Sequence, residues 1–232
     1  MIDLKNCEII DLTHSMYHGM PGWPTHPILS VKPLKILNID GYNVKELVIN
    51  THHGTHLDAP AHMLEDGKTL DQFELSKFFG EGVALDLSYK KDGEGITATD
   101  LKKFDIKRGD MVFLYTGWSK FRGFNKKYLY LWPYLTPDGA DYLVNLDVKL
   151  VGTDGLSIGA WGGSTSVAKP VDSTALEVHQ KLLGKEIIIA EEVGNLDKLL
   201  KEKNQQRAFF IVLPLKISES DGAPARIVAV LC

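Results

Sequence analysis

The segment HHGTHLDAPAH, which runs from residue 52 to residue 62, concentrates the metal-binding chemistry of this chain and guides the choice of fold. Four of the eight histidines lie in it, together with one aspartate. Its potential metal ligands all stand at even-numbered positions, an even number of residues apart: His52, His56, Asp58 and His62. Because side chains two residues apart in a strand point to the same side, these four would share one face. The segment therefore predicts a site for Zn²⁺, Mn²⁺ or Fe²⁺ on a strand.

The strand cannot be straight if it is to serve one metal. A flat strand would separate the backbones of His52 and His56 by about 13 Å, whereas each imidazole must approach a shared metal within about 2.1 Å. Gly54 is where a bulge or kink costs least, so we expect the chain to bend there. A helix, in which His52 and His56 would be four residues apart on one face, is disfavoured by Gly54 and Pro60.

The remaining histidines of the segment are expected to differ in role. His53 points to the opposite face, which predicts packing or support of a ligand. His62 follows Pro60, where the chain should turn, so it is predicted to lie near the metal as a general acid or base. The alternative is that these histidines make ordinary hydrogen bonds and that Asp58 stabilises a turn.

The length, composition and charge of the whole chain limit the number of domains, the partners and the location that can be expected. Its 232 residues are 44% hydrophobic, which predicts one domain over residues 1–232. The net charge of −4 and the scattered lysines argue against nucleic acid as a partner. No apolar run approaches the roughly 20 residues that cross a membrane, and the first residues lack a secretory signal, so a cytoplasmic location is expected. Cys7 and Cys232 are too few for a disulfide framework and are expected to carry no chemistry.

Local patterns predict a mixture of strands and helices. Thr136 and Pro137 predict the start of a helix over residues 138–144, and a capping box of Thr174 and Glu177 predicts another from Ser173. Residues 155–169 form a long glycine-rich and serine-rich loop, either a lid or a plain surface segment. Apolar, β-branched runs predict strands at residues 8–12, 44–50, 83–87, 111–115, 148–151, 186–190, 209–215 and 226–231. This order predicts a layered α/β or α+β domain with a largely buried sheet.

A family resemblance rests on these residues and on further motifs. The pattern HxGTHxDxPxH is present in full, and DLTHSMYHGMPGWP, YTGWSKF, VKLVGTDGLSI and PLKISESDGAPARIVAV occur in the expected order. The chain resembles the cyclase superfamily, which contains bacterial arylformamidases (kynurenine formamidases) and isatin hydrolases. The resemblance implies a single domain of swivelling β/β/α architecture with a mixed sheet, and a homo-oligomer, either a dimer or a tetramer.

The resemblance also implies roles for individual residues. It assigns proton transfer to His62 and substrate contact to Trp23. The implied ligands of the metal are His52, His56, Asp58, His179 and Glu191.

Residue patterns support the distant members of this set more weakly. His179 shares an apolar helix face with Leu183, so a buried core histidine is the competing interpretation. Glu191 shares strand parity with buried isoleucines, and a carboxylate there needs a partner; Glu192 is the alternative ligand.

Two further side chains keep alternative readings. Trp23 could be an ordinary packing aromatic. Asp154 could orient a ligand or stabilise a turn.

The expected function is metal-dependent hydrolysis of a small amide. A bound metal lowers the pKa of water towards 7, and the resulting hydroxide attacks a carbonyl while His62 transfers protons. Zn²⁺ is the preferred ion and Mn²⁺ the alternative, with one or two ions bound. The substrate would be an aryl formamide such as N-formylkynurenine, in tryptophan catabolism, or a lactam such as isatin; Met63 slightly favours the formamide.

Two other classes of protein are weighed against this expectation. The spacing of His56, Asp58 and His179 also fits the facial triad of non-haem iron oxygenases. That reading leaves His52 and His62 without a role, and residues 186–192 lack the arginine expected after the distal histidine of the enzymes that use 2-oxoglutarate. The other alternative is a metal-binding protein without turnover.

Overall fold

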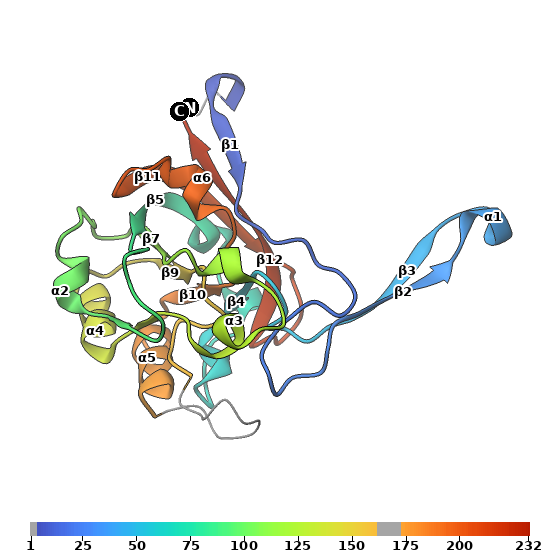
Figure 1. Cartoon of the computed structure of the whole chain (residues 1–232), viewed down its shortest axis with the longest axis horizontal. Helices are drawn as coiled ribbons and strands as arrows, with labels where there is room; N and C mark the ends of the chain where they lie inside the picture. The colour runs from blue at the N-terminus through green and yellow to red at the C-terminus, as the bar shows by residue number, and fades with distance from the viewer. Residues whose placement is uncertain (1–3, 162–172) are drawn as a thin grey trace.

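The computed structural model describes residues 4–161 and 173–232, and its main feature is an eight-stranded sheet that closes on itself (Figure 1). The strands follow the order β1-β12-β11-β5-β7-β9-β10-β4, and β4 also pairs with β12. Their bounds are β1 (Glu8–Asp11), β4 (His56–Asp58), β5 (Phe79–Asp86), β7 (Met111–Tyr115), β9 (Leu150–Thr153), β10 (Ile188–Glu191), β11 (Gln205–Pro214) and β12 (Gly222–Leu231). This mixed, largely buried sheet confirms the expected α/β fold class.

The sheet combines parallel and antiparallel pairing. Strands β5, β7, β9 and β10 are parallel to one another, whereas every pairing that involves β1, β4, β11 or β12 is antiparallel. All five residues of β7 are buried. Phe113 packs inside the closed sheet with Phe210, and Leu114 packs outside it with the helices. Burial on both faces explains why this strand is a continuous apolar run without alternation.

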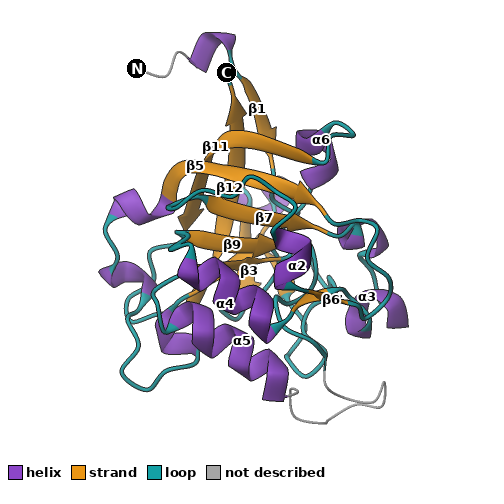
Figure 2. Ribbon diagram, turned by 90° about the vertical axis from the view of Figure 1, so that its left-hand side faces the viewer, coloured by secondary structure: helices purple, strands orange, loops and turns teal. Residues whose placement is uncertain are grey.

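Helices cover the outer face of the sheet (Figure 2). Val178 and Leu182 of α5 belong to the outer core with residues of β7 and β9. The predicted cap is present in α4, where the hydroxyl of Thr136 accepts a hydrogen bond from the amide of Gly139 at 3.3 Å. No helix in the described ranges is long and apolar enough to cross a membrane. The α-helices are α1 (Leu37–Asp40), α2 (Ala98–Leu101), α3 (Lys126–Tyr130), α4 (Pro137–Asn145), α5 (Ser173–Leu183) and α6 (Leu196–Leu200).

Shorter elements connect these layers. A two-stranded sheet of β2 (Ser30–Lys35) and β3 (Val44–Val48), joined by α1, projects from the body (Figure 1). A second small sheet pairs β6 (Gly95–Ile96) with β8 (Tyr134–Leu135). The 3₁₀ helices are η1 (Leu4–Asn6), η2 (Pro60–His62), η3 (Leu70–Gln72), η4 (Leu75–Phe78) and η5 (Trp118–Phe121).

All eight predicted strands and both predicted helices are confirmed, with shifted boundaries. Strand β11 begins at Gln205, several residues before its apolar run, because polar side chains also pair with β5 there. Strand β2 was not predicted, since Pro33 and two lysines interrupt its apolar pattern. The side chain of Thr174, expected in a capping box, and most of the expected lid loop of residues 155–169 lie outside the described residues.

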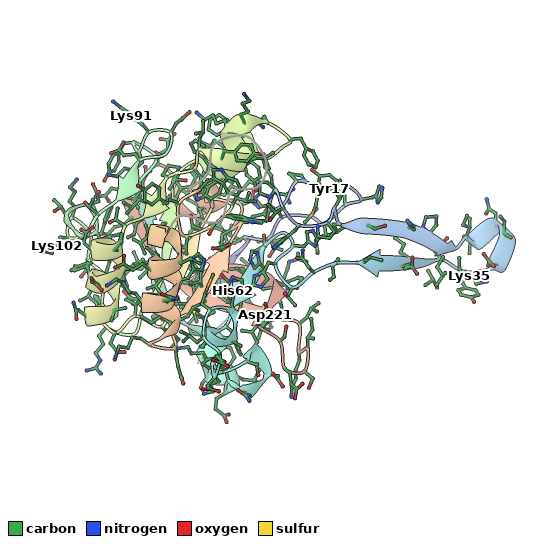
Figure 3. All side chains as sticks on the ribbon, turned by 90° about the horizontal axis from the view of Figure 1, so that it is seen from below. Tyr17, Lys35, His62, Lys91, Lys102 and Asp221 are labelled. Atoms are coloured by element: carbon green, nitrogen blue, oxygen red, sulfur yellow. A yellow bond between two sulfur atoms is a disulfide. The ribbon has the colours of Figure 1, made fainter. Side chains whose placement is uncertain are left out.

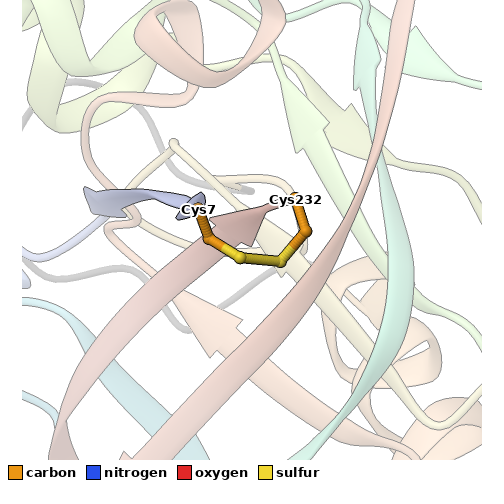
Figure 4. Close-up of a disulfide and its surroundings, with 2 residues drawn as sticks. All are labelled: Cys7 and Cys232. Carbon is orange, nitrogen blue, oxygen red and sulfur yellow. A yellow bond between two sulfur atoms is a disulfide. The ribbon is translucent and has the colours of Figure 1, made fainter. Parts of the chain in front are cut away.

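The expectation that the two cysteines carry no chemistry is wrong. Cys7 and Cys232 form a disulfide between residues 225 positions apart in the sequence (Figure 4). Strands β1 and β12 pair antiparallel, with Glu8 opposite Leu231, so the residues just beyond this pair meet at the end of the ladder. A count of cysteines could not reveal this, because the closeness of the chain ends is a property of the sheet.

Candidate metal centre

The segment from residue 51 to residue 62 adopts three conformations in succession. Residues before His56 form a turn, His56–Asp58 is strand β4, and Pro60–His62 is a 3₁₀ helix. Gly54 has φ +67°, a left-handed conformation that glycine adopts without steric cost. The predicted bend therefore occurs at Gly54. The predicted shared strand is wrong for His52, which lies in the turn and not in β4.

Strand β4 directs His56 and Asp58 to one side and Leu57 into the core. The carbonyl oxygen of Gly54 lies 2.7 Å from Nδ1 of His56. A carbonyl can only accept, so Nδ1 carries the hydrogen and Nε2 is left as the ligand atom. Nε2 lies 3.2 Å from a carboxylate oxygen of Asp58.

Glu191 and His179 reach the same place from the second half of the chain. Strand β10 pairs antiparallel with β4, which sets Glu191 directly opposite His56. Nε2 of His179, on α5, lies 3.3 Å from Oε1 of Glu191 and 3.9 Å from Oδ2 of Asp58. The hydroxyl of Ser157 donates to Oε1 of Glu191 at 2.9 Å, and the amide of Ile158 donates to it at 2.7 Å.

These residues satisfy the geometric and chemical demands of a metal site. His52, His56 and Asp58 form one group whose ligand atoms all lie within 4.8 Å of one another, and Asp58, His179 and Glu191 form another. Nε2 of His56 and Oδ2 of Asp58 are buried without a hydrogen-bond partner. Buried polar atoms are rarely left unpaired. Their position, and a donor set of imidazoles and carboxylates, fit one or two ions of Zn²⁺, Mn²⁺ or Fe²⁺.

Asp221 adds a carboxylate that the sequence patterns did not identify (Figure 3). Its Oδ2 lies 2.9 Å from Nε2 of His52 and 3.5 Å from Nδ1 of His62. Nδ1 of His52 faces Asp58 at 2.8 Å. Asp221 therefore lies between the predicted ligand His52 and the predicted proton carrier His62. Together these three form another group within ligand distance.

The only sequence signal for Asp221 is its place in Ser220-Asp221-Gly222, before a predicted strand, and an Asp-Gly pair usually indicates a turn. Gly222 is needed for close approach, because a Cβ there would lie 2.7 Å from Cε1 of His52.

The charges of the site compensate one another strongly. Burial opposes protonation of His52, but the carboxylates of Asp58 and Asp221 outweigh it and raise the pKa of His52 to about 9. Burial would raise the pKa of Asp58, yet the adjacent His52 and His56 hold it well below its usual value. Burial lowers the pKa of His62, and the nearby His52 acts in the same direction. A metal bound to His52 would replace the imidazole proton that the carboxylates of Asp58 and Asp221 stabilise.

Glu192, the alternative ligand, points elsewhere. Its Oε2 accepts from the hydroxyl of Tyr128 at 2.8 Å and from Nε of Arg122 at 3.1 Å. The side chains of Arg122 and Glu192 are 9% and 1% exposed, so this is a buried ion pair. The structure thus brings Glu191, and not Glu192, to the histidines.

His53 and Asp154 also lie outside the group of candidate ligands. Nε2 of His53 donates to the carbonyl of Pro27 at 3.0 Å. Asp154 accepts from the amide and hydroxyl of Thr116 and from the amide of Ser119. It therefore fixes the loop that follows β7.

A cavity lined in part by Trp23 opens onto the centre. Its volume is about 180 Å³. Trp23 lies in its wall and packs against Trp132 and Trp161, with ring centroids 5.9 Å and 5.1 Å away. Among these aromatic residues, the family resemblance had implied a substrate contact for Trp23 alone. The cavity is lined by Trp23, His26, His52, His56, His62, Met63, Leu156, Ser157, His179, Glu191 and Glu192.

The chain is similar to known proteins in sequence and in fold. A family model described as putative cyclase matches residues 10–160. Kynurenine formamidase of Bacillus anthracis is 28% identical over 226 residues, which cover 97% of this chain and 98% of that protein. A solved structure described as a potential metal-dependent hydrolase with cyclase activity matches with a TM-score of 0.77 at 28% identity, covering 97% of this chain and 98% of that one. Isatin hydrolase A from Ralstonia solanacearum shares the fold, with a TM-score of 0.83, 23% identity and coverage of 98% and 93%.

Proposed function

Since the chain belongs to the putative cyclase family, we propose that it is a metal-dependent hydrolase that cleaves the carbon–nitrogen bond of a small amide. The preferred substrate is an aryl formamide such as N-formylkynurenine. The observation that carries the proposal is the convergence of two groups of potential ligands on Asp58, beside a cavity that Trp23 lines. Similarity to kynurenine formamidases over nearly the whole chain supports the choice of bond.

The ligands of the metal would be His52, His56 and Asp58, with His179 and Glu191 completing a second position through Asp58. When bound there, a divalent ion lowers the pKa of water towards 7 and polarises a carbonyl oxygen. Ser157 and the amide of Ile158 hold the carboxylate of Glu191 in place. Zn²⁺ is the preferred ion for this donor set, and Mn²⁺ is the alternative.

His62 is the proton carrier in this proposal. It lines the cavity beside His52, with ring centroids 4.1 Å apart, and belongs to η2, outside strand β4 with its proposed ligands His56 and Asp58. As the oxygen of water attacks the amide carbon, the imidazole accepts the proton that water loses. It then gives a proton to the departing nitrogen as the carbon–nitrogen bond breaks. The products are a carboxylic acid and an amine.

The indole of Trp23 in the cavity wall favours an aromatic substrate. Trp161 packs edge to face against Trp23 from outside the lining, and Tyr130 packs against Trp161 with ring centroids 5.2 Å apart, which supports the position of Trp23. A planar ring bound against Trp23 would gain aromatic contacts as well as burial.

A substrate panel tests the proposal. The purified protein, loaded with Zn²⁺ or Mn²⁺, is assayed with N-formylkynurenine, formanilide, isatin and an aliphatic formamide, before and after chelation. We expect aryl formamide turnover that chelation abolishes and added metal restores. Tight metal uptake without turnover of any amide would contradict the proposal.

A variant pair tests the role of His62. His62→Ala should lower kcat by about 10²–10⁴-fold, the range of general acid–base catalysis, with metal content unchanged. His18, an exposed histidine outside the cavity, provides the matched control His18→Ala. Normal turnover by His62→Ala would refute its assigned role.

A further inference from the structure

Glu192 has an unusual backbone conformation directly beside a candidate ligand. It follows Glu191, the last residue of β10, and has φ +51°. Seven residues other than glycine have positive φ in the described part of the chain, and Glu192 is the only one of them that is buried. Left-handed backbone is uncommon outside glycine and persists only where the surrounding structure holds it. Contacts must therefore hold Glu192 in this conformation.

Backbone hydrogen bonds hold Glu192 on both sides. Its amide donates to the carbonyl of Gly155 at 3.0 Å, and its carbonyl accepts from the hydroxyl of Thr55 at 2.6 Å. Thr55 directly precedes His56 in the segment that carries the first group of candidate ligands. One hydrogen bond thus joins the residue before His56 to the residue after Glu191.

A buried ion pair anchors the side chain of Glu192. Its Oε2 accepts from Nε of Arg122 at 3.1 Å and from the hydroxyl of Tyr128 at 2.8 Å. Arg122 follows η5, and Tyr128 belongs to α3. The guanidinium is itself held, because Nη2 lies 3.5 Å from Sδ of Met20 and the central carbon lies 5.8 Å from the ring centre of Tyr17. The pair therefore ties the end of β10 to other segments of the chain.

The contacts that orient the carboxylate of Glu191 depend on the same residue. The hydroxyl of Ser157 and the amide of Ile158 donate to its Oε1. Both lie in the loop that begins near Gly155, whose carbonyl accepts from the amide of Glu192. A change in the backbone at Glu192 would therefore move the candidate ligand and the loop that orients it together.

Stability alone is a weak explanation for this ion pair. Removing two charges from water costs about as much as their attraction returns, and apolar residues of similar volume often replace a buried pair without loss of stability. The pair instead lies where a strained backbone meets a candidate ligand. Its place in the structure points to control of geometry.

We propose that Arg122 and Glu192 are positioning residues, whose ion pair holds the strained backbone after Glu191 and thereby keeps the carboxylate of Glu191 at the metal centre. The inference rests on the proposed function, because it takes Glu191 as a ligand. The pair acts through Glu191 and needs no contact with the metal.

Two double variants separate backbone geometry from charge. Arg122→Met with Glu192→Ala and Arg122→Met with Glu192→Gly both remove the pair without leaving an unpaired charge. Only glycine adopts positive φ without steric cost. Competition with a chromophoric chelator measures the affinity of each variant for Zn²⁺. We expect the alanine variant to bind Zn²⁺ about 10- to 100-fold more weakly than the wild type, the range for a lost outer partner of a ligand. The glycine variant should recover most of this loss.

A second ion pair provides the matched control. Arg207 and Asp110 lie outside the cavity lining and the groups of candidate ligands, with side chains 30% and 3% exposed and 2.6 Å between Nη2 and Oδ1. Arg207→Met with Asp110→Ala should leave the affinity for Zn²⁺ unchanged. Equal affinities of the alanine and glycine variants would overturn the inference while the wild type still binds Zn²⁺. A wild type that binds no Zn²⁺ would refute the proposed function and this inference together.

A further background tests the route through Glu191. In Glu191→Gln the carboxylate is absent whatever the backbone does, so the alanine and glycine variants should then bind Zn²⁺ equally. A difference that persists there would overturn the route. Circular dichroism and urea unfolding of the metal-free proteins check that each variant folds. If the alanine double variant does not fold, Tyr128→Phe takes its place: loss of one anchor of Glu192 should weaken Zn²⁺ binding, and wild-type affinity would count against the proposal.

Discussion

Asp221 provides the sharpest prediction about the metal centre. Its carboxylate accepts from Nε2 of His52 at 2.9 Å, while the opposite ring nitrogen faces Asp58. It would therefore fix the orientation of His52 when Nδ1 binds a metal. Loss of such an outer partner typically weakens metal binding 10- to 100-fold. The side chain of Asp221 is 43% exposed, so water can replace part of its contact. We therefore expect Asp221→Ala to weaken binding about tenfold, or about 1.4 kcal/mol.

Competition with a chromophoric chelator measures this change directly. Because Asp221 also helps to raise the pKa of His52 to about 9, its loss makes His52 easier to deprotonate at pH 7 and offsets part of the effect. The loss should therefore be larger at pH 9 than at pH 7. Asp221→Asn keeps an accepting oxygen and should bind metal within about threefold of the wild type. Asp66→Ala, at an exposed position, is the control.

Two results would refute this reasoning. One is wild-type metal affinity in Asp221→Ala at pH 9. The other is an equal loss in Asp221→Asn and Asp221→Ala, which would mean that charge alone matters and that orientation of His52 does not.

Three further predictions concern the ligands and the scaffold. Asp58→Asn removes the carboxylate shared by both ligand groups and should weaken metal binding by more than about 100-fold. Competition with the chromophoric chelator measures this loss, and an unchanged affinity would count against Asp58 as a ligand. Cys7→Ser removes a disulfide between residues 225 positions apart, and the chain-entropy model predicts a loss of about 5 kcal/mol in the free energy of unfolding, measured in urea. The reduced wild type should lose the same amount, and an unchanged unfolding midpoint would contradict the model. Asp100→Asn should cost about 1.5–3 kcal/mol at pH 7, because Lys90 and Thr97 lower the pKa of Asp100 despite its burial. A carboxylate whose pKa is lower in the folded than in the unfolded state stabilises the fold above the unfolded pKa near 4. The difference in the free energy of unfolding should therefore shrink steadily as the pH falls below that value, and a difference that stays constant would refute the assignment.

The local part of the fold could be predicted from the sequence. Apolar runs such as Met111–Tyr115 locate the strands because burial dictates their composition. The concentration of histidines around Asp58 indicates a metal site because few other structures need that density. The argument from alternation was right for His56 and Asp58, which share strand β4, and wrong for His52, which reaches the centre from the turn at Gly54.

The remaining features depend on contacts between distant segments. Asp221 lies 169 residues from His52 in the sequence and meets it only because β12 pairs with β4. Glu191 and Glu192 are adjacent in the sequence, and contacts with distant segments separate their roles, because Glu191 lies opposite His56 whereas Glu192 pairs with Arg122. The disulfide likewise follows from the pairing of β1 with β12, which no spacing of cysteines encodes.

The disulfide also changes what a break in the chain means. With Cys7 joined to Cys232, residues 7–232 form a covalent ring. A single cut in an exposed turn, such as the one around Gly93, would open this ring without releasing a fragment. The nicked protein would keep its mass until it is reduced. A chain divided in such a turn would thus consist of two peptides that the Cys7–Cys232 disulfide still joins.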